Sequence, residues 1–142
     1  MSLTLSHVTL AVTDLARSER FYAEALGFSR VYAAEPDDAF KRLLERTEAR
    51  SLAMVSMQAG DFRIELLKIE PTDGALSVPP ALGLRHMAVR VDDLQAAADR
   101  ITGAGGRALA GTDTSAGGGR FTMCADPDGV RLLLIETPKS SS

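Results

Sequence analysis

Two stretches decide the fold: LSHVTLAVTDL at Leu5–Leu15 and LRHMAVRVDDL at Leu84–Leu94. They align without gaps at an offset of 79 residues. Five of the eleven aligned positions are identical: Leu5/Leu84, His7/His86, Val12/Val91, Asp14/Asp93 and Leu15/Leu94. Agreement of this kind in a single frame predicts that the chain contains two copies of one structural module.

Each copy has the pattern of a strand followed by a helix. In the first copy Val8, Leu10 and Val12 alternate with other residues, as in a strand that buries one face. His7 falls on the opposite face of that strand. Asp14 is a good N-cap for the helix that follows, because its carboxylate can accept free backbone N–H groups.

The second copy repeats this arrangement around His86, which again falls opposite the apolar residues of its strand. Asp92 or Asp93 is expected to cap the second helix, and Gly27 and Gly103 are expected to end the two helices. The helices are expected to cover the apolar faces of the strands. The two histidines are therefore predicted to face away from the helices.

The later parts of the two modules also match. Residues 60–67, GDFRIELL, align with residues 128–135, DGVRLLLI, and both read as strands entered from a glycine-containing turn. The sequence Asp-Pro-Asp-Gly at 126–129 has strong turn chemistry. The first module carries an insertion near 36–50, in which Asp37 or Asp38 is expected to begin a short helix.

The predicted fold is α+β: two βαβββ modules form a curved mixed sheet around a cleft, with the helices outside. We expect residues 1–142 to form one domain, with an N-terminal module at 4–70 and a C-terminal module at 83–138. A chain of 142 residues is long enough to bury a core without covalent cross-links.

Composition excludes several classes of function. The net charge of −3 gives no basic footprint for nucleic acid. Cys124 is the only cysteine, so no internal disulfide framework is possible, and this suits a reducing, cytoplasmic environment. No apolar run approaches the roughly 20 residues that a membrane helix requires. These features predict a cytoplasmic protein that binds neither nucleic acid nor membrane.

The order of these motifs resembles the vicinal-oxygen-chelate superfamily, which includes glyoxalase I, extradiol dioxygenases and bleomycin resistance proteins. The resemblance rests on the histidine repeat, on Phe21-Tyr22 and Leu26-Gly27-Phe28, on Ile64-Glu65-Leu66 and on the Asp-Pro-Asp-Gly turn at 126–129. It covers nearly the whole chain and is closest in pattern to glyoxalase I-like proteins. It implies the βαβββ fold already expected from the repeat.

The resemblance also implies a metal site. Of the family's four ligand positions, three correspond here to His7, Glu65 and His86, and the fourth to Leu133, where a glutamate is usual. Glu136 lies three residues further along and is expected to face the other side of its strand, so it is not counted as a ligand. Two imidazoles and a carboxylate suit Ni, Zn, Co, Mn or Fe in the divalent state.

The ligand set and its neighbours predict the chemistry. The resemblance implies that Glu65 acts as metal ligand, as catalytic base, or as both in turn. Arg90, four residues after His86, is the candidate for binding an anionic group of the substrate. Ala11 and Ile69 stand where the resemblance would place the glutathione-binding Arg and Asn of glyoxalase I, which makes glutathione a poor fit.

The resulting functional hypothesis is a glyoxalase-like metalloenzyme of lyase or isomerase type that acts on a small oxygenated substrate. Two alternatives stay open. One is an extradiol-type dioxygenase, favoured if the metal is Fe(II). The other is a metal-free binding or resistance protein, for which Leu133 is the main argument. In each case the partner is a small molecule, and the resemblance implies a homodimer.

Overall fold

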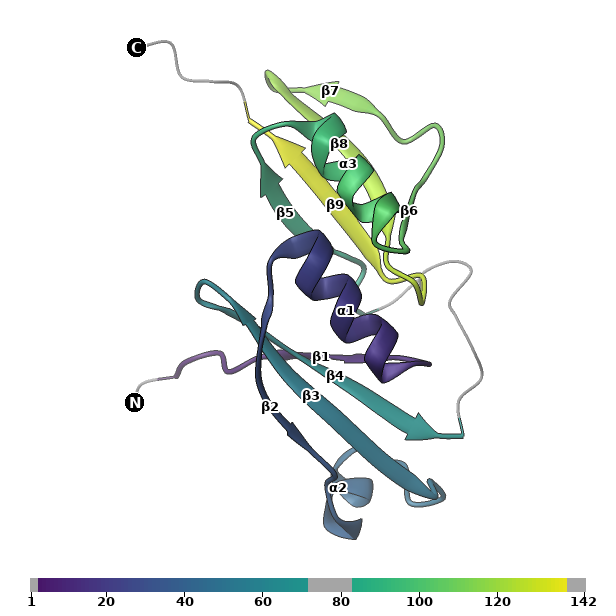
Figure 1. The fold of residues 1–142 in the computed structure, drawn as a ribbon. Coiled ribbons are helices and arrows are strands. Elements are labelled where there is room, and N and C mark those ends of the chain that lie inside the picture. The colour runs from purple at the N-terminus through teal and green to yellow at the C-terminus, as the bar shows by residue number, and fades with distance from the viewer. Residues whose placement is uncertain (1–2, 72–82, 138–142) are drawn as a thin grey trace. The chain divides into compact units, whose positions relative to one another are not determined.

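The computed structural model of the chain describes residues 3–71 and 83–137. Contacts divide the chain into two compact units, Met1–Gly74 and Ala75–Ser142. Each unit contains one mixed sheet with a helix against one of its faces (Figure 1). The predicted α+β class and the βαβββ plan are confirmed. Residue 138, the predicted end of the second module, lies outside the described residues.

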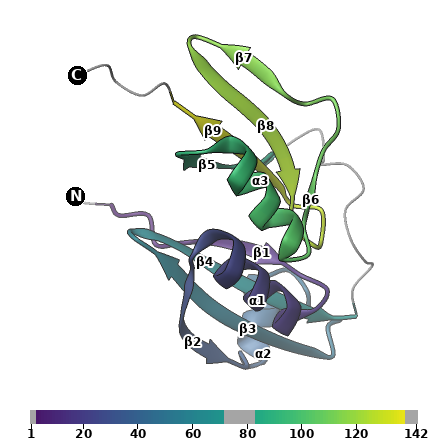
Figure 2. The same ribbon diagram turned by 45° about the horizontal axis from the view of Figure 1, so that its top comes forward.

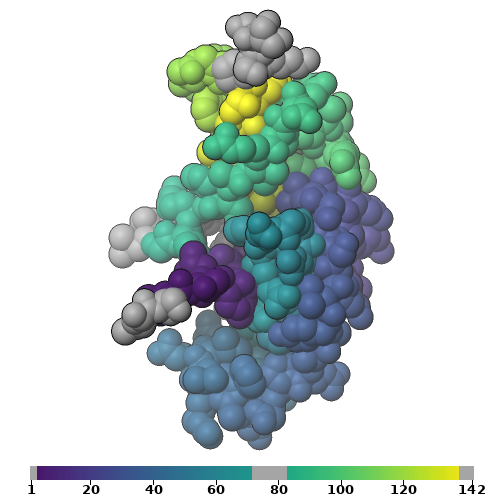
Figure 3. All heavy atoms as spheres, turned by 90° about the vertical axis from the view of Figure 1, so that its left-hand side faces the viewer, coloured from purple at the N-terminus to yellow at the C-terminus, as the bar shows by residue number. Residues whose placement is uncertain are grey.

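The first unit has strand order β1-β4-β3-β2, with β1 parallel to β4 and the other pairs antiparallel. In Figure 3 the N-terminal residues (purple) lie against teal residues of this unit, in keeping with the β1–β4 pairing. The elements of the unit are β1 (Val8–Ala11), α1 (Leu15–Leu26), β2 (Ser29–Ala34), α2 (Asp38–Leu43), β3 (Ser51–Ala59) and β4 (Phe62–Glu70).

The second unit repeats this plan with strand order β5-β9-β8-β6, and β5 is parallel to β9. In place of one continuous strand beside β8, this unit has two short strands, β6 and β7, which pair with different parts of β8. The elements are β5 (Met87–Val91), α3 (Leu94–Gly103), β6 (Arg107–Ala108), β7 (Thr114–Ala116), β8 (Gly119–Ala125) and β9 (Arg131–Glu136).

The helix boundaries follow the predicted caps. The Asp14 carboxylate accepts the backbone N–H of Arg17 at 3.0 Å, and the Asp93 carboxylate accepts that of Ala96 at 3.0 Å. Gly27 ends α1 in the left-handed conformation, with a φ of 75°. The inserted helix α2 is capped by Asp37, one of the two residues expected to begin it.

The core of each unit lies between the helix and one face of the sheet (Figure 2). In the first unit Phe21 and Tyr22 of α1 are fully buried, as are Ile64 and Leu66 of β4. In the second unit Ile101 of α3 is buried, and so are the alternate residues of β9 that share its side of the sheet. Burial of each such side chain contributes roughly 1.5–3 kcal/mol. The opposite face of each sheet carries the histidine.

The turn at 126–129 is held together by its first residue. The buried Asp126 carboxylate accepts the backbone N–H groups of Asp128 and Val130, both at 2.9 Å. Gly129 takes a φ of 93°, which glycine adopts without steric cost. The turn therefore fixes where β9 begins. Among the described residues no helix is both long and apolar enough to span a bilayer.

Candidate functional site

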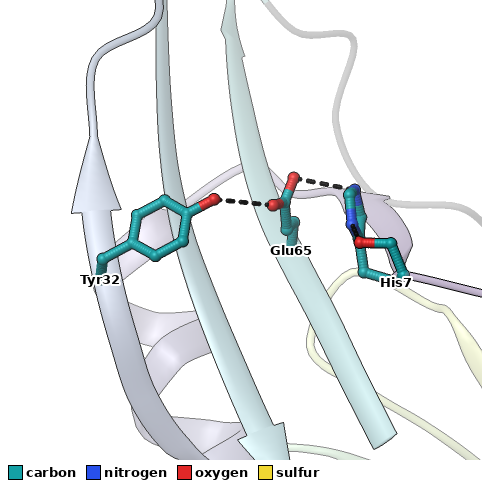
Figure 4. A network of polar contacts seen from close by, with 4 residues as sticks. His7, Tyr32 and Glu65 are labelled. Carbon is teal, nitrogen blue, oxygen red and sulfur yellow. Dashed lines mark hydrogen bonds and ion pairs between the residues drawn. The ribbon is translucent and has the colours of Figure 1, made fainter.

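The parallel pairing of β1 with β4 brings His7 to Glu65. Thr9 lies opposite Glu65 in this ladder, and His7, two residues earlier, faces the same side of the sheet. The His7 Nε2 atom lies 3.1 Å from Glu65 Oε2 (Figure 4). Two of the three predicted metal ligands are thus neighbours within the first unit.

Glu65 is a buried carboxylate with a partner for each oxygen. Only 7% of the residue is exposed, and an ionised carboxylate at such a site requires compensating donors. His7 lies beside Oε2, and the Tyr32 hydroxyl donates to Oε1 at 3.0 Å (Figure 4). Glu65 is therefore held from both sides by groups of neighbouring strands.

His7 has a second polar partner on its other ring nitrogen. Ser6 Oγ lies 2.8 Å from His7 Nδ1. With only Glu65 at Nε2, that nitrogen carries the hydrogen and the Ser6 hydroxyl donates to Nδ1, because a carboxylate can only accept. With a cation at Nε2, Nδ1 carries the hydrogen and Ser6 Oγ accepts it. A hydroxyl serves both arrangements without moving its oxygen atom.

The Glu65 carboxylate also changes the acidity of its tyrosine neighbour. The hydrogen bond from Tyr32 to Glu65 raises the pKa of Tyr32 above its ordinary value, and the negative charge of Glu65 and partial desolvation act in the same direction. The charge of Arg63 and the Ser56 hydroxyl oppose the shift. Tyr32 consequently stays protonated, and remains a donor, throughout the neutral pH range.

Tyr32 was not among the residues predicted from the sequence. It reaches Glu65 across the sheet, because Tyr32 lies opposite Ser56 and Ser56 lies opposite Glu65. The β2–β3 register shifts between Arg30 and Tyr32. An irregularity of this kind has no sequence signature of its own, so alternation along β2 could not have identified the tyrosine.

The second unit places the remaining predicted residues on the corresponding face of its sheet. His86 is exposed in the segment that leads into β5, and Arg90 is exposed within β5. Ala88 lies opposite Leu133 and Arg90 lies opposite Ile135. Since Ala88 is the repeat equivalent of Thr9, Leu133 occupies the position that Glu65 holds in the first unit.

The Glu136 carboxylate binds the N-terminus of helix α3 and does not lie on the sheet face that carries His86. Its carboxylate accepts the backbone N–H of Leu94, the first residue of α3, at 2.7 Å. A carboxylate at a helix N-terminus is favoured by the unpaired N–H groups and the helix dipole. The prediction that Glu136 faces the opposite side of β9 from Leu133 is confirmed by this contact.

The spacing of the two donors of the first unit is compatible with a shared divalent metal as well as with a hydrogen bond. Two ligand atoms that lie about 2.1 Å from one metal at a right angle are about 3.0 Å apart. His7 Nε2 and Glu65 Oε2 are 3.1 Å apart. Within neither unit do the described residues bring three His, Cys, Asp or Glu side chains together. The first unit thus supplies two donors, and His86 belongs to the other unit.

Residues 4–134 match the model of the glyoxalase/bleomycin resistance protein/dioxygenase superfamily. The chain belongs to this superfamily. An uncharacterised Escherichia coli protein, YaeR, is 33% identical over 133 residues, which cover 92% of this chain and 93% of YaeR. An ethylmalonyl-CoA/methylmalonyl-CoA epimerase of Cereibacter sphaeroides is 30% identical, over 93% of this chain and 94% of the epimerase.

Solved structures of glyoxalase superfamily proteins share the fold. A glyoxalase family protein from Bacillus cereus superposes with a TM-score of 0.80 at 21% identity, covering 96% of this chain and 95% of that chain. The fosfomycin resistance protein FosX of Listeria monocytogenes, complexed with Mn(II) and sulfate, superposes with a TM-score of 0.66 at 18% identity, covering 98% and 96%. The superfamily thus includes epimerases and fosfomycin resistance proteins, as well as lyases.

Proposed function

We propose that this chain is a metal-dependent enzyme of lyase or isomerase type that acts on a small oxygenated substrate. The observation that carries the proposal is the 3.1 Å separation of His7 Nε2 and Glu65 Oε2 on one face of the first sheet. A nitrogen and a carboxylate donor at this distance suit one divalent transition metal. FosX, a protein of similar fold, was crystallised with Mn(II), in keeping with a divalent metal on this fold.

The proposed ligand set is His7, Glu65 and His86. Three protein donors leave coordination positions free for vicinal oxygens of a substrate and for water. A divalent metal held by these residues would act as a Lewis acid on the oxygens of the substrate. Ser6 keeps the His7 ring oriented through Nδ1, and the buried Glu65 supplies the negative charge of the site.

The two modules offer one carboxylate rather than two at their equivalent positions. Glu65 occupies the position in β4, and Leu133 occupies it in β9. A reaction that removes a proton from one face of a carbon atom and returns it to the other commonly needs a base on each side. A single carboxylate favours a lyase or a one-base isomerase over such a two-base epimerisation.

Arg90 is the proposed anchor for an anionic group of the substrate. It is exposed on β5, and strand alternation places it on the same face as His86. A guanidinium binds carboxylate or phosphate through paired hydrogen bonds. Arg90→Ala is expected to raise KM for an anionic substrate with little change in kcat. An unchanged KM would remove Arg90 from the site.

A second candidate function is metal-free binding of a small hydrophobic ligand. Leu133 favours it, because an apolar side chain stands at a position where a metal-binding glutamate is usual. Register places Phe121, Met123 and Ile135 on the same face of the second sheet as Leu133. This face is apolar enough to contact a hydrophobic ligand without any metal. An extradiol-type dioxygenase remains the enzymatic alternative if the metal is Fe(II).

The test is elemental analysis of the purified protein beside a His7→Ala/His86→Ala double variant. The proposal predicts about one equivalent of a divalent transition metal per site in the wild type and none in the double variant. Arg46→Ala/Arg50→Ala, a pair of exposed substitutions outside the site, is the matched control and should retain the metal. A wild type that stays empty after reconstitution with Ni, Zn, Co, Mn and Fe would favour the binding protein.

Assembly and location complete the proposal. We expect a homodimer, which sedimentation equilibrium of the purified chain would detect as twice the 15.1 kDa mass.

The single cysteine, Cys124, is buried, and burial raises the pKa of its thiol. An unreactive thiol of this kind is compatible with the cytoplasmic location expected from the sequence.

A further inference from the structure

A β-bulge in β2 determines which side chain faces Glu65. Arg30 pairs with Met57, and Tyr32 pairs with Ser56, so two steps along β2 correspond to one step along β3. Val31 is the extra residue. In a regular ladder Val31 would lie opposite Ser56, and Tyr32 would point to the helix side of the sheet. The bulge thus turns Tyr32 toward the polar face. Bulges commonly re-aim side chains beside active sites.

The turned tyrosine contacts one oxygen of Glu65 only. Its hydroxyl donates to Oε1 at 3.0 Å, while Oε2 lies 3.1 Å from His7 Nε2. The two oxygens of the carboxylate are therefore distinguished. Oε1 accepts the hydrogen bond of the tyrosine hydroxyl, and Oε2 is directed to the histidine.

We infer that Tyr32 is a positioning residue that holds Glu65 as a one-oxygen ligand beside His7. The inference rests on the proposed function, since it assigns a role toward the proposed metal. A carboxylate that has no second partner can rotate and present both oxygens to one metal, or neither. The hydrogen bond from Tyr32 prevents this rotation. It also compensates the buried oxygen that does not face the metal.

Several features separate this role from simple packing. Tyr32 is 43% exposed, so its ring adds little to the core. The residue directly opposite it in β3 is Ser56, a small residue that leaves the path to Glu65 open. Partners that orient metal ligands in this way typically change metal affinity by about 10- to 100-fold when they are removed.

The experiment compares Co(II) binding to the wild type and to the Tyr32→Phe variant of the full chain. Dissociation constants come from competition with a chromophoric chelator, and visible absorption reports the coordination of bound Co(II). We expect Tyr32→Phe to weaken Co(II) binding by about 10-fold or more and to change the absorption spectrum, while the metal-free variant stays folded with a somewhat lower melting temperature because the hydrogen bond is lost. Tyr22→Phe is the matched control, because it deletes the hydroxyl of the buried tyrosine in α1 and should leave the spectrum unaltered.

The outcomes are distinguishable. If wild type and Tyr32→Phe bind Co(II) with the same affinity and spectrum, the positioning role is wrong, and the proposed metal-dependent function stands. If the wild type binds neither Co(II) nor any other divalent metal tested, the proposed function is wrong, and the role of Tyr32 is overturned with it. A loss of affinity accompanied by an equal effect of Tyr22→Phe would indicate a general structural change and would also overturn the inference.

Discussion

Glu65 and Leu133 occupy equivalent positions in the last strands of the two modules. Glu65 lies opposite Thr9, two residues after His7, and Leu133 lies opposite Ala88, two residues after His86. One module therefore presents a carboxylate where the other presents a methyl-bearing side chain. This asymmetry within a repeated framework is the basis of the first prediction.

Leu133→Glu is expected to restore a fourth ligand and to strengthen metal binding by about 10-fold or more, since each added carboxylate donor raises affinity. Without metal the variant should be less stable by about 1–3 kcal/mol, because Leu133 is half-buried and a carboxylate there lacks a partner. Titration of metal affinity and urea unfolding with and without metal test both effects. Leu133→Gln, which is similar in size but uncharged, should show the loss of stability with a much smaller gain in affinity.

The hydrogen bond from Tyr32 to Glu65 predicts a loss of stability in alkali. The pKa of Tyr32 is raised in the folded protein, so its contribution is fully present below the ordinary tyrosine value and is lost as pH rises through the raised value. The free energy of unfolding of the wild type should therefore fall above about pH 10 more steeply than that of Tyr32→Phe. Equal slopes for the two proteins would show that the hydroxyl has no such role.

Asp126 is predicted to be the most important residue of the 126–129 turn. It is 2% exposed and its carboxylate accepts two backbone N–H groups. Asp126→Ala removes both hydrogen bonds and leaves one buried and one part-buried donor unpaired, which should cost about 2–4 kcal/mol of unfolding free energy. Chemical denaturation measures this loss. The exposed Asp61, in the turn between β3 and β4, is the control position, and Asp61→Ala should change stability by less than about 0.5 kcal/mol.

The ion pair between Glu19 and Arg30 predicts a small loss of stability in acid. Both guanidinium contacts to the carboxylate are 2.6 Å, and the hydrogen bond from Arg30 lowers the pKa of Glu19. A lowered pKa contributes stability above the ordinary glutamate value, and this is lost as pH falls through the lowered value. Because the pair is largely at the surface, Arg30→Ala should lower the stability only slightly near neutral pH. The difference from wild type should vanish at pH 2; a difference that persists there would assign the effect to packing of the arginine.

The sequence was sufficient for the framework and for part of the site. The repeat fixed the relation between His7 and His86, because strand alternation carries the face of each histidine along with the cap that follows it. The proximity of Glu65 to His7 came only from the family resemblance, since no local pattern states which strands pair across 58 residues. Tyr32 could not be predicted as a site residue for another reason. A single extra residue, Val31, reverses which side chains of β2 face each side of the sheet. The chemistry of the Val31 side chain does not indicate a bulge.

Because β1 lies at the edge of its sheet, local opening of this strand affects how long His7 and Glu65 stay in contact. His7 stands in the segment that leads into this four-residue strand, and among the strands that the structure describes only β4 pairs with β1. Short edge strands open far more often than central ones, by fluctuations that leave the rest of a protein folded. Each such opening separates the imidazole from the carboxylate. We therefore expect the pair to be broken by fraying of the N-terminal strand more often than by global unfolding of the chain.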